Sequence, residues 1–247
     1  MRFIAFLLIQ GWLASCTSPV EKPIDIASPQ VSVGLEKTQS DAKEALLPNN
    51  IVAVSQYCPG VKVDLKYATP ENFMKQVLYT KWKDAYLQKE VADQLNTALR
   101  TLKKTNPSYS FLVYDAARPV SVQRKMWIAL DTIPVKERVK FVSNPNNRSL
   151  HNYGCAVDIT LIDADGNTLD MGAGYDDIRS IAYPSMETYF LKTGALTSEQ
   201  VSNRKILRKA MFTGGFTNIP TEWWHFNACS RKFAAAHYEA ILTEVDF

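Results

Sequence analysis

The residues best suited to chemistry are the histidines, of which the chain has three. His151 lies in the stretch SLHNYGCAVDITL, seven residues before Asp158, and Gly154 between them permits a tight turn from a loop into a strand. Asp158 stands among apolar residues, and a buried carboxylate needs a metal, an arginine or a set of donors. Taken alone, the pair fits a structural histidine and a turn-capping aspartate as well as it fits half of a metal site.

A second histidine strengthens the case for a metal. In the stretch TEWWHF, Glu222 lies three residues before His225. Two histidines and one carboxylate, with an open fourth position, form the ligand set of a catalytic zinc. We therefore expect His151, Asp158 and His225 to bind one zinc ion per chain, and Glu222 to be the base that does not bind it.

This assignment requires Glu222 to lie outside a regular strand. Side chains alternate along a strand, so strict alternation would place Glu222 and His225 on opposite faces. Pro220, just upstream, indicates that Glu222 lies in the loop that enters the strand. The third histidine, His237, stands in an alanine-rich segment, and we expect it to pack or to face the surface.

The elements that must position these residues follow from the hydrophobic pattern. Apolar residues recur at spacings of three and four from Trp82 to Leu102, which predicts an amphipathic helix. Alternating or short apolar runs predict strands at 61–68, 110–116, 155–163, 168–172 and 221–228. Further helices are expected at 121–130, with Ser121 as its cap, at 197–211 and at 230–245. This mixture, with a hairpin-type turn at 163–167, predicts an α+β fold with a largely antiparallel central sheet flanked by helices.

The N-terminus has the pattern of an export signal. MRFIAFLLIQGWLASC begins with one basic residue and continues with an apolar run from Phe3 to Leu13, which is short for a transmembrane helix. Small residues then precede Cys16, a pattern that resembles a bacterial lipoprotein signal and implies cleavage before Cys16 and a lipid on its thiol. The alternative is an ordinary secretory signal with an incidental cysteine. Either signal places the mature protein outside the cytoplasm.

We therefore expect a signal peptide at 1–15, a lipidated cysteine and disordered tether at 16–50, and one catalytic domain at 51–247. The tether is rich in proline, serine and charge and has no sustained periodicity. The lipid would anchor the domain to a membrane, facing the periplasm if the source has an outer membrane. A net charge of +3 without a long basic run argues against a nucleic-acid partner. The pattern does not indicate an oligomeric state.

Three cysteines remain in the expected domain, namely Cys58, Cys155 and Cys229. A disulfide is allowed in an exported protein, but the sequence does not pair them, and buried free thiols are at least as good an interpretation. Their scatter does not match the paired CxxC motifs of a zinc ribbon, so we do not assign them as ligands.

Five motifs, in order, resemble one enzyme family. SLHNYGCAVD matches the S-x-H-x-x-G-x-A-x-D motif of zinc D,D-peptidases, and EWWHF matches their E-x-W-H motif. DLKYATPENF, YDAARP and DMGAGYD resemble signatures of one branch, the D-alanyl-D-alanine dipeptidases of the vancomycin-resistance type. Together the segments span Asp64 to Phe226, which is most of the expected domain.

The resemblance implies a role for further residues by position. Arg118, in AARP, would be the arginine that stabilises the transition state. The residues that would shape the substrate pocket are Tyr67, Asp115, Ser149 and Asp176, with Asp176 facing the substrate's amine. Without the resemblance, Arg118 fits a structural ion pair with Asp115, and Tyr67 fits core packing.

The expected function is zinc-dependent hydrolysis of the D-alanyl-D-alanine dipeptide outside the cytoplasm, in cell-wall peptide metabolism. One alternative is a D,D-carboxypeptidase or L,D-type endopeptidase that acts on peptidoglycan stem peptides. An alternative of another class is a non-catalytic wall-binding lipoprotein with a structural zinc. Glu222 argues against the last, because a structural zinc site is closed and needs no base.

Overall fold

A five-stranded mixed sheet forms the centre of the fold. The computed structural model describes residues 50–139 and 141–244. The strand order is β2-β4-β5-β7-β6, in which β2 is parallel to β4 and the other pairs are antiparallel. These strands are β2 (Lys62–Val63), β4 (Ser110–Asp115), β5 (Ala156–Ile162), β6 (Thr217–Asn218) and β7 (His225–Asn227). A separate two-stranded sheet pairs β1 (Ile51–Ala53) with β3 (Tyr86–Gln88).

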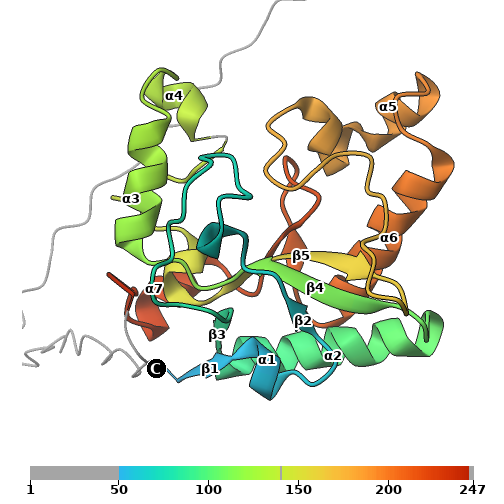
Figure 1. Ribbon diagram of the computed structural model, residues 1–247, viewed down its shortest axis with the longest axis horizontal. Helices are drawn as coiled ribbons and strands as arrows, with labels where there is room; N and C mark the ends of the chain where they lie inside the picture. Colours follow the sequence, from blue (N-terminus) through green and yellow to red (C-terminus); the bar gives the residue numbers. More distant parts are fainter. Residues whose placement is uncertain (1–49, 140, 245–247) are drawn as a thin grey trace, which may run out of the picture. The chain divides into compact units, whose positions relative to one another are not determined.

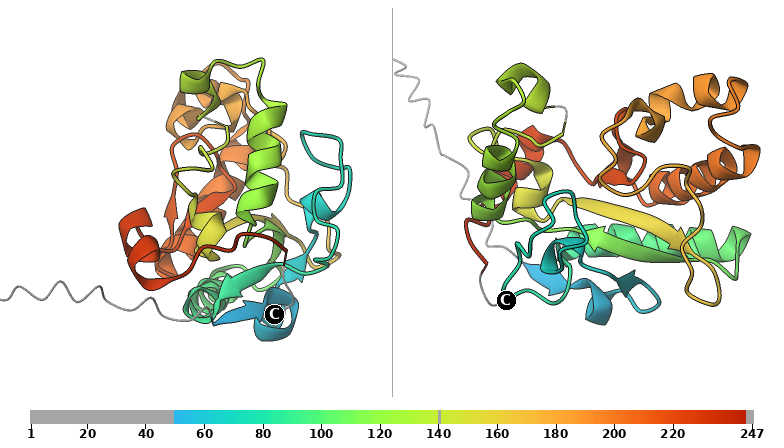
Figure 2. Two further views of the ribbon diagram at one scale, coloured as in Figure 1. Left: turned by 90° about the vertical axis from the view of Figure 1, so that its left-hand side faces the viewer. Right: turned by 45° about the horizontal axis from the view of Figure 1, so that its top comes forward.

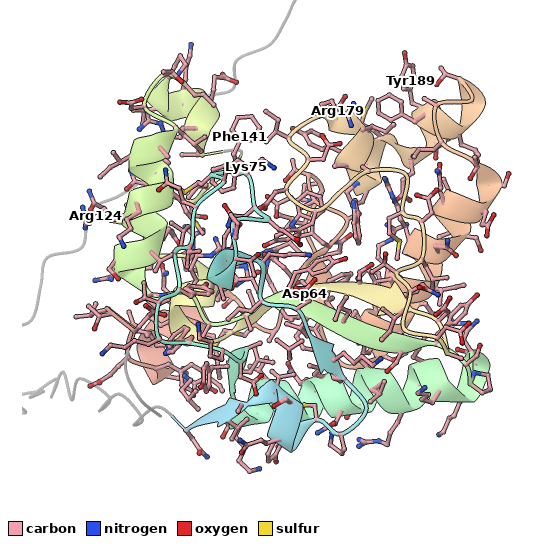
Figure 3. The ribbon with its side chains drawn as sticks, in the orientation of Figure 1. Asp64, Lys75, Arg124, Phe141, Arg179 and Tyr189 are labelled. Atoms are coloured by element: carbon pink, nitrogen blue, oxygen red, sulfur yellow. The ribbon has the colours of Figure 1, made fainter. Side chains whose placement is uncertain are left out.

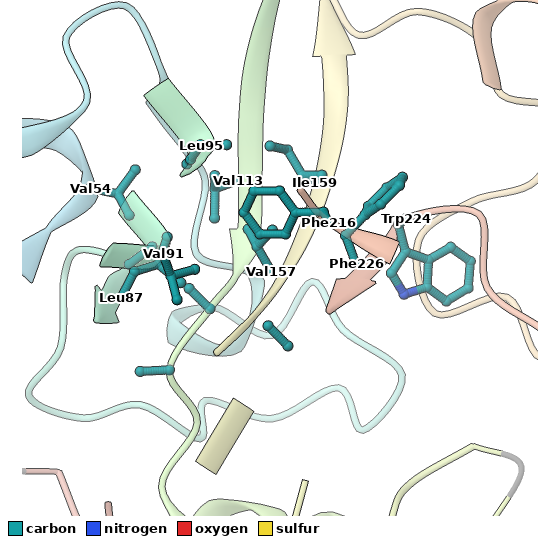
Figure 4. Packing of buried hydrophobic residues seen from close by; sticks show 14 of the residues in the cluster. Val54, Leu87, Val91, Leu95, Val113, Val157, Ile159, Phe216, Trp224 and Phe226 are labelled. Atoms are coloured by element: carbon teal, nitrogen blue, oxygen red, sulfur yellow. The ribbon is translucent and has the colours of Figure 1, made fainter. Parts of the chain in front are cut away.

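The long helix α2 (Lys89–Thr105) packs beneath the sheet and contacts β4 (Figure 1). Its apolar side chains recur at helical spacing and are buried, which makes the helix amphipathic. Alternate side chains of the strands meet this apolar stripe. Figure 4 shows the resulting core, which includes Val91 and Leu95 of α2 and Val113, Val157, Ile159 and Phe226 of the sheet.

The remaining helices lie mainly on the other side of the sheet. In Figures 1 and 2, the segment with α3 (Val120–Ala129) and α4 (Val135–Arg138) stands on one side of β5, and α5 (Glu187–Lys192) stands on the other. Helix α6 (Ser198–Thr213) reaches down to pack against α2. The short elements are α1 (Val54–Tyr57), α7 (Arg231–His237) and the 3₁₀ helices η1 (Lys66–Ala68), η2 (Leu150–Tyr153), η3 (Ser180–Ala182) and η4 (Pro184–Met186).

The predicted α+β class with a largely antiparallel sheet is confirmed. The strand that carries Asp158 and the helix near 197–211 occur close to their expected places, and Thr197 caps α6 with a capping box. None of the helices in residues 50–139 and 141–244 has both the length and the apolar character that a membrane span requires. Cys16 and most of the predicted tether lie outside the described residues.

The helix predicted from Trp82 was placed too early, because α2 begins at Lys89. The apolar residues before Lys89 belong to an aromatic cluster and not to a helix. Trp82 packs its ring against Tyr79 and Tyr86, with centroids 5.6 and 5.1 Å apart, and this aromatic cluster leads into β3. Ser121 does not cap α3 either, since that helix starts at Val120 directly after a proline.

Several predicted elements are shorter than expected. The segment at 61–68 pairs only over Lys62–Val63 and then turns into η1, and 168–172 forms a single bridge through Thr168. The strand at 221–228 is reduced to β7. The closing helix ends at His237, because the backbone of Tyr238 is extended. The residues that follow leave the helix, and the Ile241 amide donates a hydrogen bond to the Asn152 carbonyl.

Candidate metal centre and substrate pocket

Three neighbouring strands place polar side chains in one row across the sheet. Asp158 of β5 is paired with His225 of β7 on one side and with Asp115 of β4 on the other. A register shift between Val113 and Asp115 brings the Asp115 side chain onto the face of Asp158. Side chains alternate along β5, so Val157 faces α2 while Asp158 faces away from it. The row therefore lies on the face opposite the apolar core.

The three predicted metal ligands converge at this row. His225 Nδ1 lies 3.0 Å from Asp158 Oδ1 and 3.1 Å from His151 Nε2, and His151 Nε2 lies 3.4 Å from Asp158 Oδ1. Among the described residues, these are the side chains that group closely enough to hold a metal ion, with all ligand atoms within 4.8 Å of one another. The sequence elements that deliver them are η2, β5 and β7.

Each histidine has its other ring nitrogen held by an oxygen. His151 Nδ1 lies 2.5 Å from the Ala116 carbonyl oxygen, and His225 Nε2 lies 2.8 Å from Asn227 Oδ1. If those nitrogens carry the protons and donate them, His151 Nε2 and His225 Nδ1 present lone pairs to the same point. Such outer hydrogen bonds fix the tautomer and ring orientation of metal-binding histidines. Two imidazoles oriented in this way and one carboxylate are a donor set that fits zinc.

Arg118 lies beside the three ligands and is nearly buried. Its Nε and Nη2 lie 2.8 and 2.7 Å from Asp115 Oδ2, and Nη2 lies 3.4 Å from Asp158 Oδ2. The guanidinium also lies 5.2 Å from the centre of the Tyr67 ring. The structural ion pair with Asp115 is therefore present, but Nη1 makes no hydrogen bond with any described residue and the side chain lines the pocket.

A cavity of about 370 Å³ opens over the metal ligands. One wall comes from the segment that follows α3, with Phe141 and Val142, and the facing wall comes from the loop after β5, with Asp176 and Ile178. Figure 3 shows Arg179 at the outer end of this loop, away from β5. The cavity is large enough for a small peptide and holds both carboxylates and arginines.

Comparison with known proteins places this chain in a family. The family model Peptidase M15, described as D-Ala-D-Ala dipeptidase, matches residues 48–243. The chain belongs to the M15 peptidase family. A D-alanyl-D-alanine dipeptidase of Escherichia coli is 32% identical over 179 residues, which cover 71% of this chain and 83% of the relative. One of Synechocystis sp. is 32% identical over 175 residues, which cover 60% of this chain and 71% of that relative.

A solved LD-carboxypeptidase structure aligns with this M15 peptidase at a TM-score of 0.43 and 19% identity, over 76% of this chain and 72% of that one. That likeness is too distant to bear on the activity. Membership of the M15 family makes the chain an enzyme, a metallopeptidase.

Glu222 of this M15 peptidase lies in a loop, as the pattern predicted, because β7 begins only at His225. Its Oε2 lies 3.8 Å from His225 Nδ1 and its side chain lines the cavity. Burial raises the pKa of Glu222 to about 7; the nearby His225 opposes this rise and Asp158 adds to it. A carboxylate with a pKa near the working pH is suited to accept a proton and to return it.

Asp176 and Tyr67 form a second polar group in the cavity. The Tyr67 hydroxyl lies 3.1 and 3.2 Å from the two Asp176 oxygens, and both residues line the pocket. Burial, and next the charge of Asp158, raise the pKa of Asp176 to about 8. Asp176 has no ion-pair partner in the described part of the chain, whereas the neighbouring Asp177 is bound by Arg179 at 2.6 Å. An ammonium group would supply the cation that Asp176 lacks.

The other predicted pocket residues divide into two groups. Ser149 lines the cavity, and its hydroxyl donates to Gln123 Oε1 at 2.6 Å. Asp115 does not line it, because its carboxylate is fully buried behind Arg118 and accepts a hydrogen bond from Tyr79 at 2.7 Å. The position of Asp115 indicates that it holds Arg118 rather than touching a substrate.

Two adjacent tryptophans lie at the site, and the third histidine packs away from the metal ligands, as expected. Trp224 lines the cavity, and Trp223 is buried with its Nε1 donating to the Ala173 carbonyl. His237 stacks on Phe233 with ring centroids 3.9 Å apart, as a packing histidine would.

Sequence reasoning missed three residues of the site. Tyr175 donates to Asp158 Oδ2 at 3.0 Å, and Asn227 orients His225 as described. Arg231, the first residue of α7, lines the cavity and forms no hydrogen bond or ion pair with the residues that the structure describes. Tyr175 lies within the motif DMGAGYD and Asn227 directly follows EWWHF, so their positions in the sequence were an available signal; no such signal marked Arg231.

Proposed function

We propose that this M15 peptidase hydrolyses the D-alanyl-D-alanine dipeptide and that zinc, held by His151, Asp158 and His225, is its metal. The observation that carries the proposal is that one small cavity is lined by the ligand cluster, by the carboxyl group of Asp176, which has no ion-pair partner among the described residues, and by the exposed guanidinium of Arg231. A free dipeptide carries one ammonium and one carboxylate, so its two ends can pair with these two groups, and the ammonium would draw Asp176 into its ionised form. The names of the relatives support the same substrate.

The chain's own groups account for the proton transfers. Zinc, when bound, supplies a Lewis acid and lowers the pKa of water to about 7. Glu222 takes a proton from the attacking water and delivers it to the leaving nitrogen. Arg118, which stays charged, donates from Nη1 to the oxyanion that forms at the scissile carbonyl, and losing such a donor typically raises the barrier by about 2.7–4 kcal/mol.

The substrate range separates this proposal from its nearest alternative. A dipeptidase recognises a free amine, whereas a carboxypeptidase or endopeptidase acting on stem peptides leaves the amino side open. The purified chain, supplied with zinc, should be incubated with D-Ala-D-Ala, with its N-acetyl form and with a pentapeptide stem. Turnover of the free dipeptide alone supports the proposal. Equal rates on all three would establish the alternative, and no turnover of any would refute the proposed substrate.

Asp176 is expected to select for the free amine. A charge-assisted hydrogen bond in a partly dry pocket is worth about 1.5–3 kcal/mol, and an acylated amine leaves the buried Asp176 without a cation to pair with. The wild-type protein should therefore prefer D-Ala-D-Ala over N-acetyl-D-Ala-D-Ala by on the order of a hundredfold or more. Asp176→Asn should reduce that ratio of kcat/KM values sharply.

Asp177→Asn is the matched control for this measurement, because it changes the adjacent carboxylate, which Arg179 already binds. The control should keep the wild-type preference. If Asp177→Asn lowered the ratio and Asp176→Asn did not, the amine would be bound by Asp177.

Arg231 is expected to bind the substrate's carboxylate. The other arginine that lines the cavity, Arg118, is already engaged by Asp115 and Asp158. Arg231→Gln should raise KM for D-Ala-D-Ala about tenfold, the equivalent of one charge-assisted bond, with little change in kcat. It should not weaken binding of the dipeptide amide, which has no terminal carboxylate. Lys232→Gln, an exposed neighbour outside the cavity lining, is the control. Equal losses on the acid and the amide would refute this role.

We also propose that the protein is an exported lipoprotein anchored through Cys16, as its leader pattern indicates. Cys16→Ser should then abolish metabolic labelling with palmitate in the producing cells. The measurement compares labelled bands of the variant and the wild type at matched expression. Labelling that persists in the variant would return residues 1–15 to an ordinary secretory signal.

A further inference from the structure

Two of the cysteines lie side by side at the end of the sheet. Cys155 directly precedes β5, and the Ala228 amide donates to the Cys155 carbonyl oxygen at 2.9 Å. This bond continues the pairing of β5 with β7 by one residue and carries the following residue, Cys229, next to Cys155. The Cys155 thiol donates to the Tyr153 carbonyl oxygen at 3.5 Å, and the two thiols lie close enough for each to shift the pKa of the other.

The two thiols differ in access. Cys155 is fully buried, whereas Cys229 is half-buried and so can be reached by a molecule from solution. The nearness of Cys155 lowers the pKa of the Cys229 thiol, whereas Cys229 and burial raise the pKa of Cys155, so Cys229 is the thiol that reacts first. Cys58 has no part in this pair, since it is buried elsewhere and its sulfur donates to the Ala92 carbonyl.

We propose that Cys155 and Cys229 are the site of an intramolecular disulfide, formed by exchange with a small-molecule or protein disulfide. The Cys229 thiolate attacks one sulfur of the donor, the donor's S–S bond breaks, and one donor thiolate leaves. Cys155 gives up its proton, attacks the Cys229 sulfur and releases the second donor thiol. Two protein thiols and one donor disulfide thus become one protein disulfide and two donor thiols.

The cross-link would join the two ends of a long segment that contains Asp158, Glu222 and His225. Neither cysteine lines the substrate cavity, and Cys155 packs in the apolar core. The bond would therefore stabilise the strands that carry the site without entering it. Closing a long loop removes conformational freedom from the unfolded chain, so the oxidised protein should be the more stable form.

The test begins with the folded full-length chain, incubated with oxidised glutathione and then alkylated after denaturation without reduction. Peptide mapping should find the peptides of Cys155 and Cys229 joined, with Cys58 alkylated as a free thiol. The unfolding temperature should rise on oxidation and fall again after dithiothreitol treatment, and hydrolysis of the dipeptide should survive both treatments.

Cys229→Ser provides the matched control, because buried Cys155 then has neither a partner nor direct access to glutathione. In this variant Cys155 should remain alkylatable and the unfolding temperature should not respond to oxidation. Glutathione that stays on Cys229 in the wild type, free thiols at both positions, or a Cys229 bond between two chains would each overturn the proposal. The wild-type mapping decides the question even if the variant does not fold.

Discussion

Replacing Glu222 with glutamine is expected to abolish nearly all hydrolysis of D-Ala-D-Ala while zinc stays bound. Glutamine keeps the size of the side chain but cannot take a proton, and Glu222 lies outside the cluster of metal ligands. A general base contributes typically ~10²–10⁴-fold to the rate, and more where the same group also returns the proton. The measurement is kcat/KM at saturating zinc, together with the zinc content of the same samples.

The control for this experiment is Glu199→Gln, which makes the same chemical change at an exposed position in the first turn of α6. That variant should keep wild-type activity. A Glu222→Gln protein with wild-type kcat/KM would show that Glu222 is not the base and that its place beside His225 is structural. Loss of zinc from Glu222→Gln would instead make this residue a ligand.

Removing either histidine of the cluster is expected to remove the metal and with it all hydrolysis. His151→Ala and His225→Ala each leave two of three ligand atoms, and each also leaves the buried Asp158 carboxylate with fewer partners. Zinc per chain should fall from about one to near zero after dialysis, by analogy with sites that depend on three protein ligands. Elemental analysis of the purified proteins provides the measurement.

His237→Ala is the matched control, since His237 stacks on Phe233 and contributes nothing to the cluster. It should retain stoichiometric zinc. If His151→Ala or His225→Ala bound zinc as well as the control did, the three side chains would be a hydrogen-bonded network and not a metal centre. Circular dichroism of each variant separates metal loss from unfolding.

The metal cluster was predictable because its residue types are rare and their neighbourhoods are distinctive. Two of the three histidines have a carboxylate close by in sequence, and two histidines with one carboxylate are among the few ligand combinations of a catalytic zinc site. Their convergence depends on a pairing that no local pattern contains, namely Asp158 opposite His225. The ordered motifs supplied that long-range information through resemblance, and the residues alone did not.

The errors in the fold have a similar cause. Apolar spacing near Trp82 imitated a helix because an aromatic cluster happened to share its periodicity, and the tertiary packing with Tyr79 decided the outcome. Asp115 was predicted to shape the pocket. The irregular pairing of β4 near Val113 instead places it behind Arg118 and outside the cavity lining. Arg231 escaped notice because an arginine at the start of a short helix has no sequence feature that sets it apart.

Asp115, Asp158 and His225 lie in a row on three paired strands, so their relative positions tolerate less sequence change than the cavity walls do. The distances within the row are set by backbone pairing, so a single insertion inside β5 would turn Asp158 toward the opposite face. The cavity walls come from other segments, those that follow α3 and β5. Mutations there can alter which peptide enters without disturbing the ligands. A change of substrate should therefore come from substitutions in these connecting segments, while the three paired strands keep their length and register.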